Sequence, residues 1–272
     1  MIAFPNCKIN LGLHILRKRT DGFHDLETVF YPVALQDALE IVQNPTPSAD
    51  IQLTTSGLSI DARPEQNICY KAYQLLKNDF LQLPSIKMHL HKVIPSGAGL
   101  GGGSSDGAFT LTLLNKKFNL RLTEDQLLRY ALQLGSDCPF FIKNQPCYAI
   151  GRGEQLEAIP LNLSKYKIIL VNPGIHIPTG KAFSKIQPSD ERTSIREIIQ
   201  KPVEDWKAFL KNDFEDTVFA EHAGIKNIKE KLYRQGAVYA SMSGSGSTVY
   251  GLFEKNASVP LDLPSKYFIK QI

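Results

Sequence analysis

Strict alternation of apolar and polar residues predicts the first strand of the chain, at residues 8–15. One face of this stretch holds Ile9, Leu11, Leu13 and Ile15, and the other holds Lys8, Asn10, Gly12 and His14. A period of two is the side-chain period of a β-strand, and one apolar face is typical of a strand buried on one side. We therefore expect a half-buried strand, followed by a hairpin-type turn at Asp21 and Gly22.

Further periodic segments predict both strands and helices in the first half of the chain. The expected strands lie at 28–33, 38–42 and 86–91, with a polar loop at 44–48. A helix is expected over 68–80, with Asn67 as its N-cap. A second helix begins at Thr123, which forms a capping box with Gln126, and ends at Gly135.

The second half of the chain has a similar mixture. A buried strand is expected at 166–171, and two short strands at 237–242 and 248–253 flank a glycine-serine segment. A helix is expected over 203–219, and one of its faces holds Trp206, Phe209, Leu210 and Phe214. Strands and helices do not alternate regularly, which favours the α+β class over a doubly wound sheet.

Length and composition indicate an ordinary globular protein of one large or two modest domains. The 272 residues exceed the ~150 typical of one domain, and a boundary near 155–165 would leave two α+β halves. We therefore expect domains at 1–158 and 159–272. The 31 lysines and arginines exceed the 27 acids by only four, so the charge does not indicate nucleic acid, although it would tolerate an anionic ligand.

Sequence features that would direct the chain to a membrane or out of the cell are not found. No apolar run approaches the ~18 residues of a membrane span, and the first residues do not resemble a signal peptide. The four cysteines have no CxxC spacing, which favours reduced thiols. We expect a cytoplasmic protein that binds neither membrane nor nucleic acid.

Glycine is concentrated between a predicted strand and a predicted helix. The segment consists of Pro95, Ser96, Gly97, Ala98, Gly99, Leu100, Gly101, Gly102, Gly103, Ser104 and Ser105. Five glycines among seven residues let the backbone turn and approach a ligand closely. The helix N-terminus adds unpaired N–H groups and the positive end of its dipole, so we expect a site for the phosphates of a nucleotide.

Three familiar phosphate-binding motifs fit this segment poorly. A P-loop would need a lysine after the glycines, and none follows. Gly97, Gly99 and Gly102 match the dinucleotide fingerprint, but the acidic residue at the required offset, Glu124, lies in a helix cap, and several strands precede the segment. The HRD and DFG motifs of protein kinases are absent.

Asp137 is a candidate catalytic carboxylate. It follows a predicted helix end and precedes the apolar residues 139–142, so we expect it to be partly buried and in need of a cation. Lys8, Arg17 and Arg152 are candidate cations. A structural ion pair explains the pattern as well as a catalytic one does.

Other candidate functional residues are less specific. The segment Ser243–Thr248 is either a simple hairpin loop or a second group of N–H donors for the same phosphates. Phe23, His24 and Phe183 could stack on a base, although such residues are often ordinary core or surface aromatics. The spacing of His14, His89, His91 and His222 does not fit a metal site, so none is expected.

Taken together, the strand with Lys8, the glycine segment at 95–105 and the late Gly244-Ser-Gly246 resemble the GHMP kinase superfamily, named for galacto-, homoserine, mevalonate and phosphomevalonate kinases. Residues 8–28, 134–141 and 172–179 are similar to the branch that phosphorylates a cytidine-diphosphate-linked methylerythritol. The element Asp21-Gly-Phe-His24 is specific to that branch.

The resemblance implies a two-domain α+β fold, with an N-terminal domain like the second domain of ribosomal S5-type proteins and a ferredoxin-like C-terminal domain. It implies transfer of the ATP γ-phosphate, with Mg²⁺ accompanying ATP, to the 2-hydroxyl of the methylerythritol unit, in the non-mevalonate isoprenoid pathway. The alternatives are a homoserine- or mevalonate-type kinase, and a catalytically silent nucleotide-binding module.

The resemblance also implies a division of labour among residues. Lys8 and Asp137 match the catalytic pair, in which the lysine keeps the carboxylate ionised and the carboxylate accepts or orients the hydroxyl proton. The segment 95–105 matches the one that wraps the ATP phosphates, and Asn67 and Lys92 match positions near the adenosine. The residues that match substrate-binding positions are Asn10, Phe23, His24, Thr179 and Phe183.

This chain departs from the family pattern at several positions. Ala98 stands where glycine is usual, Asp106 where asparagine is frequent, and Phe23 where tyrosine is frequent. None of these changes removes a required functional group. The acidic Mg²⁺ ligand of several relatives has no clear counterpart, so no protein ligand is assigned to the metal.

Overall fold

Two compact units make up the chain in the computed structural model, which describes residues 1–46, 49–60 and 63–272. Unit 1 comprises Met1–Cys7, Ala34–Ser96 and Gly101–Gln145; unit 2 comprises Lys8–Val33, Gly97–Leu100 and Pro146–Ile272. Both units contain helices and strands, which confirms the predicted two-domain α+β fold. Because each unit is assembled from several stretches of chain, the linear boundary at residue 158 stays a prediction. Two residues of the expected loop at 44–48, Pro47 and Ser48, lie outside the described residues.

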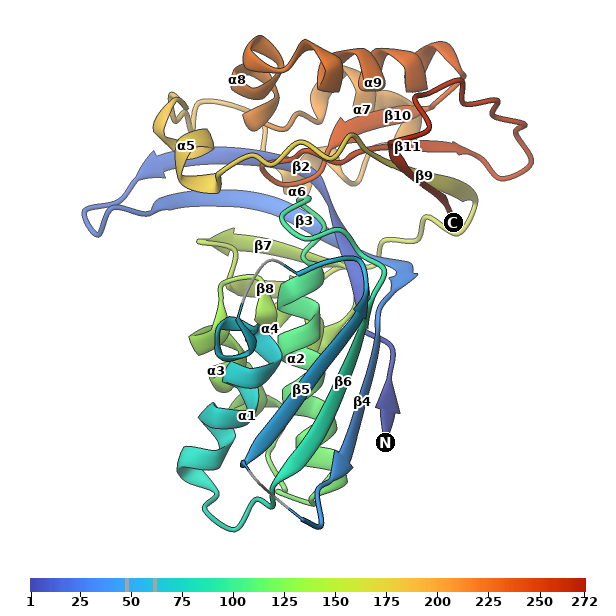
Figure 1. Cartoon of the computed structure of the whole chain (residues 1–272). Helices are drawn as coiled ribbons and strands as arrows, with labels where there is room; N and C mark the ends of the chain where they lie inside the picture. The colour runs from blue at the N-terminus through green and yellow to red at the C-terminus, as the bar shows by residue number, and fades with distance from the viewer. Residues whose placement is uncertain (47–48, 61–62) are drawn as a thin grey trace. The chain divides into compact units, whose positions relative to one another are not determined.

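A four-stranded sheet with helices on one face forms unit 1 (Figure 1). The strand order is β1 (Ile2–Ala3), β4 (Ala38–Gln43), β6 (Ile86–Lys92) and β5 (Ile51–Gly57). β5 and β6 are parallel, and helix α1 (Ile68–Asp79) makes the crossover that parallel neighbours require. α1 packs against α2 (Gly102–Lys117), which is followed by α3 (Glu124–Leu134) and α4 (Cys138–Lys143).

The predicted caps of α1 and α3 are confirmed. The Asn67 side chain accepts the N–H of Cys69 at 2.9 Å, and Thr123 and Gln126 form a reciprocal capping box. These caps satisfy N–H groups that have no partner within the helix. The sequence pattern missed four short elements among the described residues of unit 1: β1, β5, α4 and a 3-10 turn at Pro64–Gln66.

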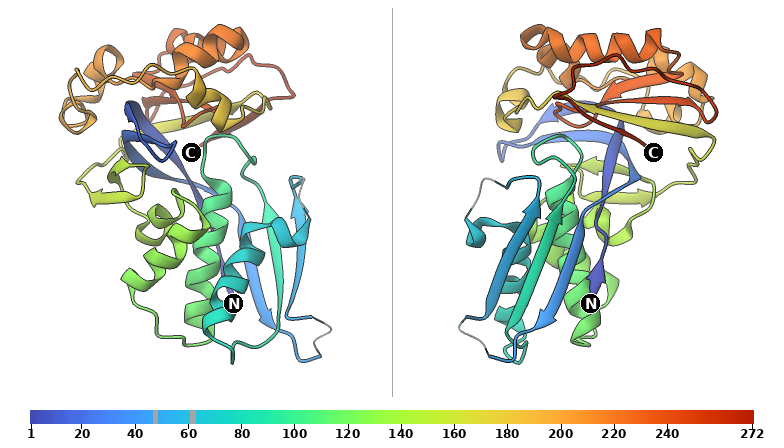
Figure 2. Two further views of the ribbon diagram at one scale, coloured as in Figure 1. Left: turned by 90° about the vertical axis from the view of Figure 1, so that its left-hand side faces the viewer. Right: turned by 45° about the vertical axis from the view of Figure 1, so that its right-hand side comes forward.

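Two antiparallel sheets form the framework of unit 2 (Figure 2). The first has the order β2 (Asn6–Lys18), β3 (His24–Gln36), β7 (Cys147–Gly151) and β8 (Gln155–Ala158). The ends of β2 and β3 at residues 6–7 and 34–36 are assigned to unit 1. The second has the order β10 (Tyr239–Met242), β11 (Val249–Glu254), β9 (Tyr166–Asn172) and β12 (Phe268–Gln271). The helices are α5 (Thr179–Ser184), α6 (Ile195–Ile198), α7 (Val203–Phe209), α8 (Phe214–Glu221) and α9 (Ala223–Arg234).

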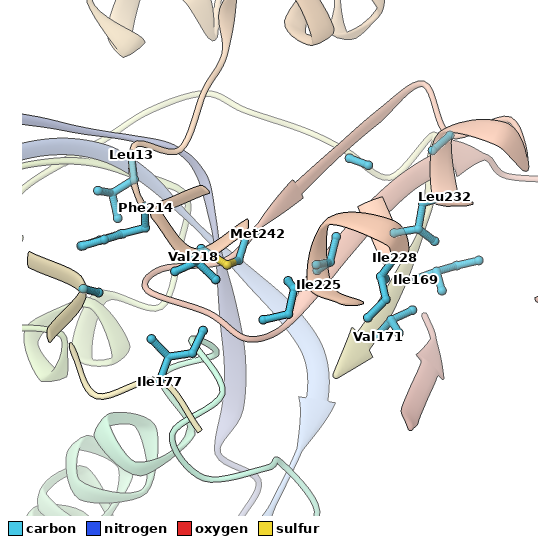
Figure 3. Close-up of a cluster of buried hydrophobic side chains, with 14 of the residues drawn as sticks. Leu13, Ile169, Val171, Ile177, Phe214, Val218, Ile225, Ile228, Leu232 and Met242 are labelled. Atoms are coloured by element: carbon cyan, nitrogen blue, oxygen red, sulfur yellow. The ribbon is translucent and has the colours of Figure 1, made fainter. Parts of the chain in front are cut away.

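An apolar cluster connects helices α5, α8 and α9 of unit 2 to its strands (Figure 3). α9 contributes Ile225, Ile228 and Leu232, which repeat at helical spacing. Leu13 from β2 and Met242 from β10 belong to the same cluster. The core therefore fixes β2 and the end of β10, the two strands from which the candidate functional segments extend.

The strand at 8–15 is buried on both faces, so the predicted half-buried strand is wrong in this respect. Lys8, Asn10 and His14, on the polar face, are only 2–3% exposed. The predicted alternation of apolar and polar residues is present, but the polar face is covered by hydrogen-bonding groups of unit 2 rather than by water. A buried polar side chain is tolerated when it has such partners.

The predicted single helix at 203–219 is also wrong, because the chain is extended between α7 and α8. The N–H of Leu13 donates to the carbonyl of Lys211, and the N–H of Asp213 donates to the carbonyl of Leu13, both at 2.9 Å. Leu210 covers Gly12, where a Cβ would lie 2.5 Å from its Cδ1. Pairing with β2 thus overrides the helical periodicity of residues 210–213.

No helix formed by the described residues, 1–46, 49–60 and 63–272, is long and apolar enough to cross a membrane. All four cysteines lie within the described residues; they form no disulfide bonds, and all are buried.

A buried carboxylate, Glu27, joins four parts of unit 2. It accepts hydrogen bonds from the Tyr148 hydroxyl at 2.6 Å, the Ser194 hydroxyl at 2.7 Å and the N–H of Ile195 at 2.9 Å, and its Oε1 lies 2.9 Å from Nδ1 of His14. Burial alone would raise the pKa of Glu27, but these hydrogen bonds to the ionised form lower it to about 2.

This network predicts a specific acid sensitivity. Because the pKa of Glu27 in the folded protein lies below its unfolded-state value near 4.5, the ionised carboxylate stabilises the fold above pH 4.5. That stability is lost as the pH falls towards 2. Between pH 6 and pH 3 the wild-type protein should lose about 2 kcal/mol more unfolding free energy than Glu27→Gln, measured by urea unfolding. Glu230→Gln, the same change at an exposed position of α9, should behave as the wild type. Equal losses in Glu27→Gln and wild type would contradict the network.

Candidate active site

Lys8 lies in β2 with its ammonium group almost completely buried. Its side chain is part of a residue only 3% exposed, and Nζ donates to Oδ1 of Asn10 at 2.6 Å. Nζ also lies 4.7 Å from the centre of the Phe30 ring, at a cation–π distance. Alternation along β2 places Lys8 and Asn10 on the same face, as the sequence predicted.

Asn10 connects four segments of unit 2. Its Nδ2 donates to Oγ1 of Thr28 at 3.0 Å, and its N–H donates to Oγ of Ser243 at 3.2 Å. Its carbonyl accepts the hydroxyl of Tyr250 at 2.8 Å. These bonds leave Oδ1 facing Lys8, so the orientation of the amide is determined by its neighbours.

The two glycine segments of unit 2 lie directly against each other. Gly99 has φ +77°, and a Cβ on it would lie 2.0 Å from the carbonyl oxygen of Ser243. The Ser243 hydroxyl donates to the Gly99 carbonyl at 2.8 Å, and the N–H of Thr248 donates to the Ala98 carbonyl at 3.2 Å. Residues 243–248 are therefore more than a hairpin loop, because they support the glycine segment.

The segment at 172–179 completes this cluster. Nδ2 of Asn172 donates to the Thr248 hydroxyl at 2.9 Å, and the Ser247 hydroxyl donates to the carbonyl of Ile175 at 2.5 Å. The Thr179 and Ser245 hydroxyls are 3.3 Å apart. Three segments that are remote in sequence thus form one polar cluster at the end of β2, β9 and β10.

Helix α2 begins within the glycine-rich segment, earlier than the expected loop at 97–105 allowed. Gly101 adopts φ +68° and precedes the first helical residue, Gly102. Gly102, Gly103, Ser104 and Ser105 therefore form the first turn of α2. The first N–H groups of a helix have no carbonyl partner inside it, so this turn can bind an anion.

Asn67 and Lys92, expected near the adenosine, both have partners inside unit 1. The Asn67 oxygen caps α1, and the residue is 8% exposed. Lys92 is 2% exposed, and its ammonium binds the carboxylates of Asp37 and Asp106.

Asp137 directly precedes α4 in unit 1 and is partly buried, as its sequence context predicted. Two of the three candidate cations for it have carboxylate partners in unit 2. Arg17 donates to Asp25 at 2.5 Å, and Arg152 lies 3.7 Å from Glu154. Both observations weaken the case for an arginine partner of Asp137.

The aromatic candidates all lie in unit 2 and contact different neighbours. His24 and Phe183 are stacked, with ring centres 5.0 Å apart and planes inclined by 20°. Phe23 is 52% exposed, and the guanidinium of Arg152 lies 4.9 Å above its ring. Phe183 also packs edge-on against Phe214 of the core.

Sequence reasoning missed several residues that build this cluster. Asn212 donates to the carbonyls of Met242 and Gly244 at 2.7 and 2.8 Å, and Thr28 donates to the carbonyl of Gly12 at 2.5 Å. Nδ1 of His176 would lie 3.1 Å from a Cβ at Gly97. Thr28 and His176 had a local signal, because they lie in the motifs at 8–28 and 172–179. Asn212 is recognisable only in the folded chain.

Among residues 1–46, 49–60 and 63–272, no three His, Cys, Asp or Glu side chains are grouped so that they could hold a metal ion.

Comparison with known proteins now defines the class. Residues 67–145 match the GHMP kinases N terminal domain, and residues 194–261 match the GHMP kinases C terminal domain. The chain belongs to the GHMP kinase family.

Several of the proteins similar to this chain are kinases of one name. A Bacteroides thetaiotaomicron protein, 4-diphosphocytidyl-2-C-methyl-D-erythritol kinase, is 56% identical over 260 residues, which are 96% of this chain and 94% of that protein. A crystal structure of 4-(cytidine 5'-diphospho)-2C-methyl-D-erythritol kinase has 30% identity and a TM-score of 0.78, covering 93% of this chain and 90% of the other. Mevalonate kinase from Methanococcus jannaschii, at 15% identity and a TM-score of 0.68, covers 100% of this chain and 97% of its own and shares the fold.

The backbone of Gly99 lies so close to the Ser243 carbonyl that a single added methyl group should destabilise the protein. Gly99→Ala must strain a left-handed backbone and displace the Ser243 carbonyl, which should cost about 2 kcal/mol or more. We expect the melting temperature, followed by circular dichroism, to fall by roughly 4–8 °C. Gly224→Ala, where a Cβ meets nothing within 4 Å, should not lower it. An unchanged melting temperature in Gly99→Ala would contradict the packing of the two segments.

Proposed function

We propose that this protein is an ATP-dependent small-molecule kinase that transfers the γ-phosphate of ATP to the 2-hydroxyl of 4-diphosphocytidyl-2-C-methyl-D-erythritol. The products are the 2-phosphate and ADP, and the reaction belongs to the non-mevalonate route to isoprenoid precursors. The observation that carries this proposal is the high identity to kinases of that name over almost the entire chain. The polar cluster of unit 2 supports it, because residues from two of the motifs similar to that branch, 8–28 and 172–179, both bind the segment 243–248 there.

We assign the binding of the ATP phosphates to the glycine segment at 95–105. Its helix N-terminus offers N–H donors and a positive dipole end, and Gly99 allows close backbone approach. Mg²⁺, when bound with ATP, would neutralise phosphate charge. Phosphoryl transfer depends mainly on such positioning and charge stabilisation, and little covalent chemistry is required of the protein.

The chemical step is assigned to Lys8 and Asp137. Asp137 accepts or orients the proton of the acceptor hydroxyl. Lys8, whose ammonium is held by Asn10 and removed from water, stabilises negative charge that develops during transfer. Asn10 holds this ammonium and contributes a polar contact to the acceptor.

Recognition of the cytosine is assigned to the aromatic residues of unit 2. Phe183 and Phe23 provide stacking surfaces, His24 reads the polar edge of the base, and Thr179 provides a hydroxyl. In the structure His24 stacks on Phe183, so the base would replace or extend an existing ring stack. Arg152, above Phe23, holds that ring in place.

The function is tested by ADP release from Mg-ATP with a panel of acceptors: 4-diphosphocytidyl-2-C-methyl-D-erythritol, mevalonate, homoserine, galactose and none. We expect turnover with the cytidylyl compound alone. Turnover with another acceptor would overturn the substrate while retaining the kinase. A folded, ATP-binding protein that turns over none of them would be a silent nucleotide-binding module.

The assignment of Asp137 predicts a selective loss of catalysis. Asp137→Asn should lower kcat by roughly 10²- to 10⁴-fold, the range for a positioned acid or base, while nucleotide affinity is retained. Asp79→Asn, a carboxylate that binds Tyr130 in the same unit, should leave kcat unchanged. A fall in kcat of less than about fivefold would show that Asp137 is not catalytic.

The assignment of Phe183 predicts a change in one Michaelis constant only. Loss of a base-stacking ring costs about 1–3 kcal/mol, so Phe183→Ala should raise the KM for the cytidylyl substrate at least fivefold and spare the KM for ATP. Phe219 packs against the same core cluster, so Phe219→Ala is the control for a general loss of core packing. If both constants rose equally in Phe183→Ala, the stacking assignment would fail.

A further inference from the structure

Three charged side chains are buried together in unit 1, where β6 leads into the glycine segment. Asp37 is 1% exposed, and Lys92 and Asp106 are each 2% exposed. The Lys92 ammonium donates to Oδ2 of Asp37 and, at 2.9 Å, to Oδ2 of Asp106. Burial of three such groups is costly unless each has partners, so their arrangement needs an explanation.

Asp37 binds more than the lysine. Its Oδ1 accepts the N–H of Val93 at 2.5 Å and the N–H of Ile94 at 2.9 Å. Its own N–H donates to the carbonyl of Pro5 at 2.8 Å, which fixes it at the junction of β3 and β4. Pro95, the first residue of the glycine segment, follows directly, so Asp37 determines how the chain enters that segment.

Lys92 extends this control to the start of α2. A Cβ at Gly102 would lie 3.1 Å from Nζ of Lys92 and 2.8 Å from Cγ2 of Ile94, so the first helical residue rests on both. Asp106, one turn further along α2, binds the same ammonium. Asp37 thus holds the beginning of the segment directly and its helical end through Lys92.

The charge of this cluster depends on Asp106. Burial raises the pKa of Asp106 to about 7, opposed by Lys92 and reinforced by Asp37. Among the described residues, no group hydrogen-bonds to Oδ1 of Asp106, which disfavours the ionised form of this buried carboxyl. Cys69 of α1 also faces it, and burial raises the pKa of that thiol. Ionisation of Asp106 therefore adds one negative charge to the cluster.

We propose that Asp37 is a positioning residue for nucleotide binding, which holds residues 93–94 directly and α2 through Lys92 and Asp106 so that the glycine segment presents its N–H groups to the phosphates. The proposal rests on the nucleotide-binding function assigned to that segment. Lys92 then acts through the segment, since its ammonium is already bound to two carboxylates.

Asp37→Asn tests this directly, because it keeps the volume of the side chain and places an amide where the carboxylate met Lys92. We expect the Kd for Mg-AMP-PNP, by titration calorimetry without acceptor, to rise at least tenfold. Hydrogen exchange of the amides of Val93 and Ile94 should accelerate at least tenfold. At saturating ATP, kcat and the KM for the acceptor should stay within threefold.

The matched control is Asp213→Asn in unit 2. Asp213 likewise accepts a backbone N–H, from Ile15 at 2.7 Å, and binds a cation, Arg192. It should lower the melting temperature without changing the Kd for Mg-AMP-PNP. A Kd within twofold of wild type in folded Asp37→Asn protein would overturn the proposal. Because no acceptor is present, this outcome is independent of the substrate assignment.

Asp106→Asn provides a second test that does not depend on the stability of the first variant. In the wild type, ionisation of Asp106 adds negative charge beside the glycine segment as the pH rises through 7. The Kd of the wild type for Mg-AMP-PNP should therefore rise between pH 6 and pH 8.5. This rise should exceed that of the variant about three- to tenfold. Protonation of Mg-AMP-PNP itself affects both proteins equally, so comparing their Kd values at each pH removes that contribution. Identical pH profiles would overturn the coupling through Asp106.

Discussion

The polar face of β2 is buried, and the organisation of unit 2 follows from that constraint. Lys8, Asn10 and His14 cannot reach bulk water, so each must find a partner within the protein. Asn10 finds Thr28 and Ser243, and His14 finds Glu27. Those partners come from β3 and from the segment after β10, and satisfying one strand therefore brings together parts of the chain more than 200 residues apart.

Backbone proximity is the second consequence. Once Ser243 binds Asn10, its carbonyl lies where any side chain at Gly99 would collide with it. Glycine at that position permits two loops to pack with their backbones in contact. Gly99 matters mainly because it lacks a side chain and so leaves room for another backbone; its flexibility matters less.

Two buried ammonium groups illustrate how the chain manages charge. Lys8 is almost completely buried, with the Asn10 amide and the Phe30 ring beside its ammonium. Lys92 binds two carboxylates, which make it a link between strand β6 and helix α2. Each buried ammonium thus has partners inside the unit that contains it.

Local pattern by itself determined much of this protein. The alternation around Lys8, the caps at Asn67 and Thr123, the buried strand β9 and the glycine segment all follow from short-range periodicity and turn chemistry, and the motif order indicated the GHMP kinase class. Helix α9 is not among the predicted elements, although its Ile225, Ile228 and Leu232 repeat at helical spacing. Tertiary structure alone decided the break between α7 and α8, the burial of both faces of β2, and the place of β12, which pairs with β9 from the far end of the sequence. It also decided that Asp37 would meet Lys92 and Asp106, because hydrogen bonds and ion pairs between remote segments depend on how strands are packed, and no periodicity in the chain encodes that distance.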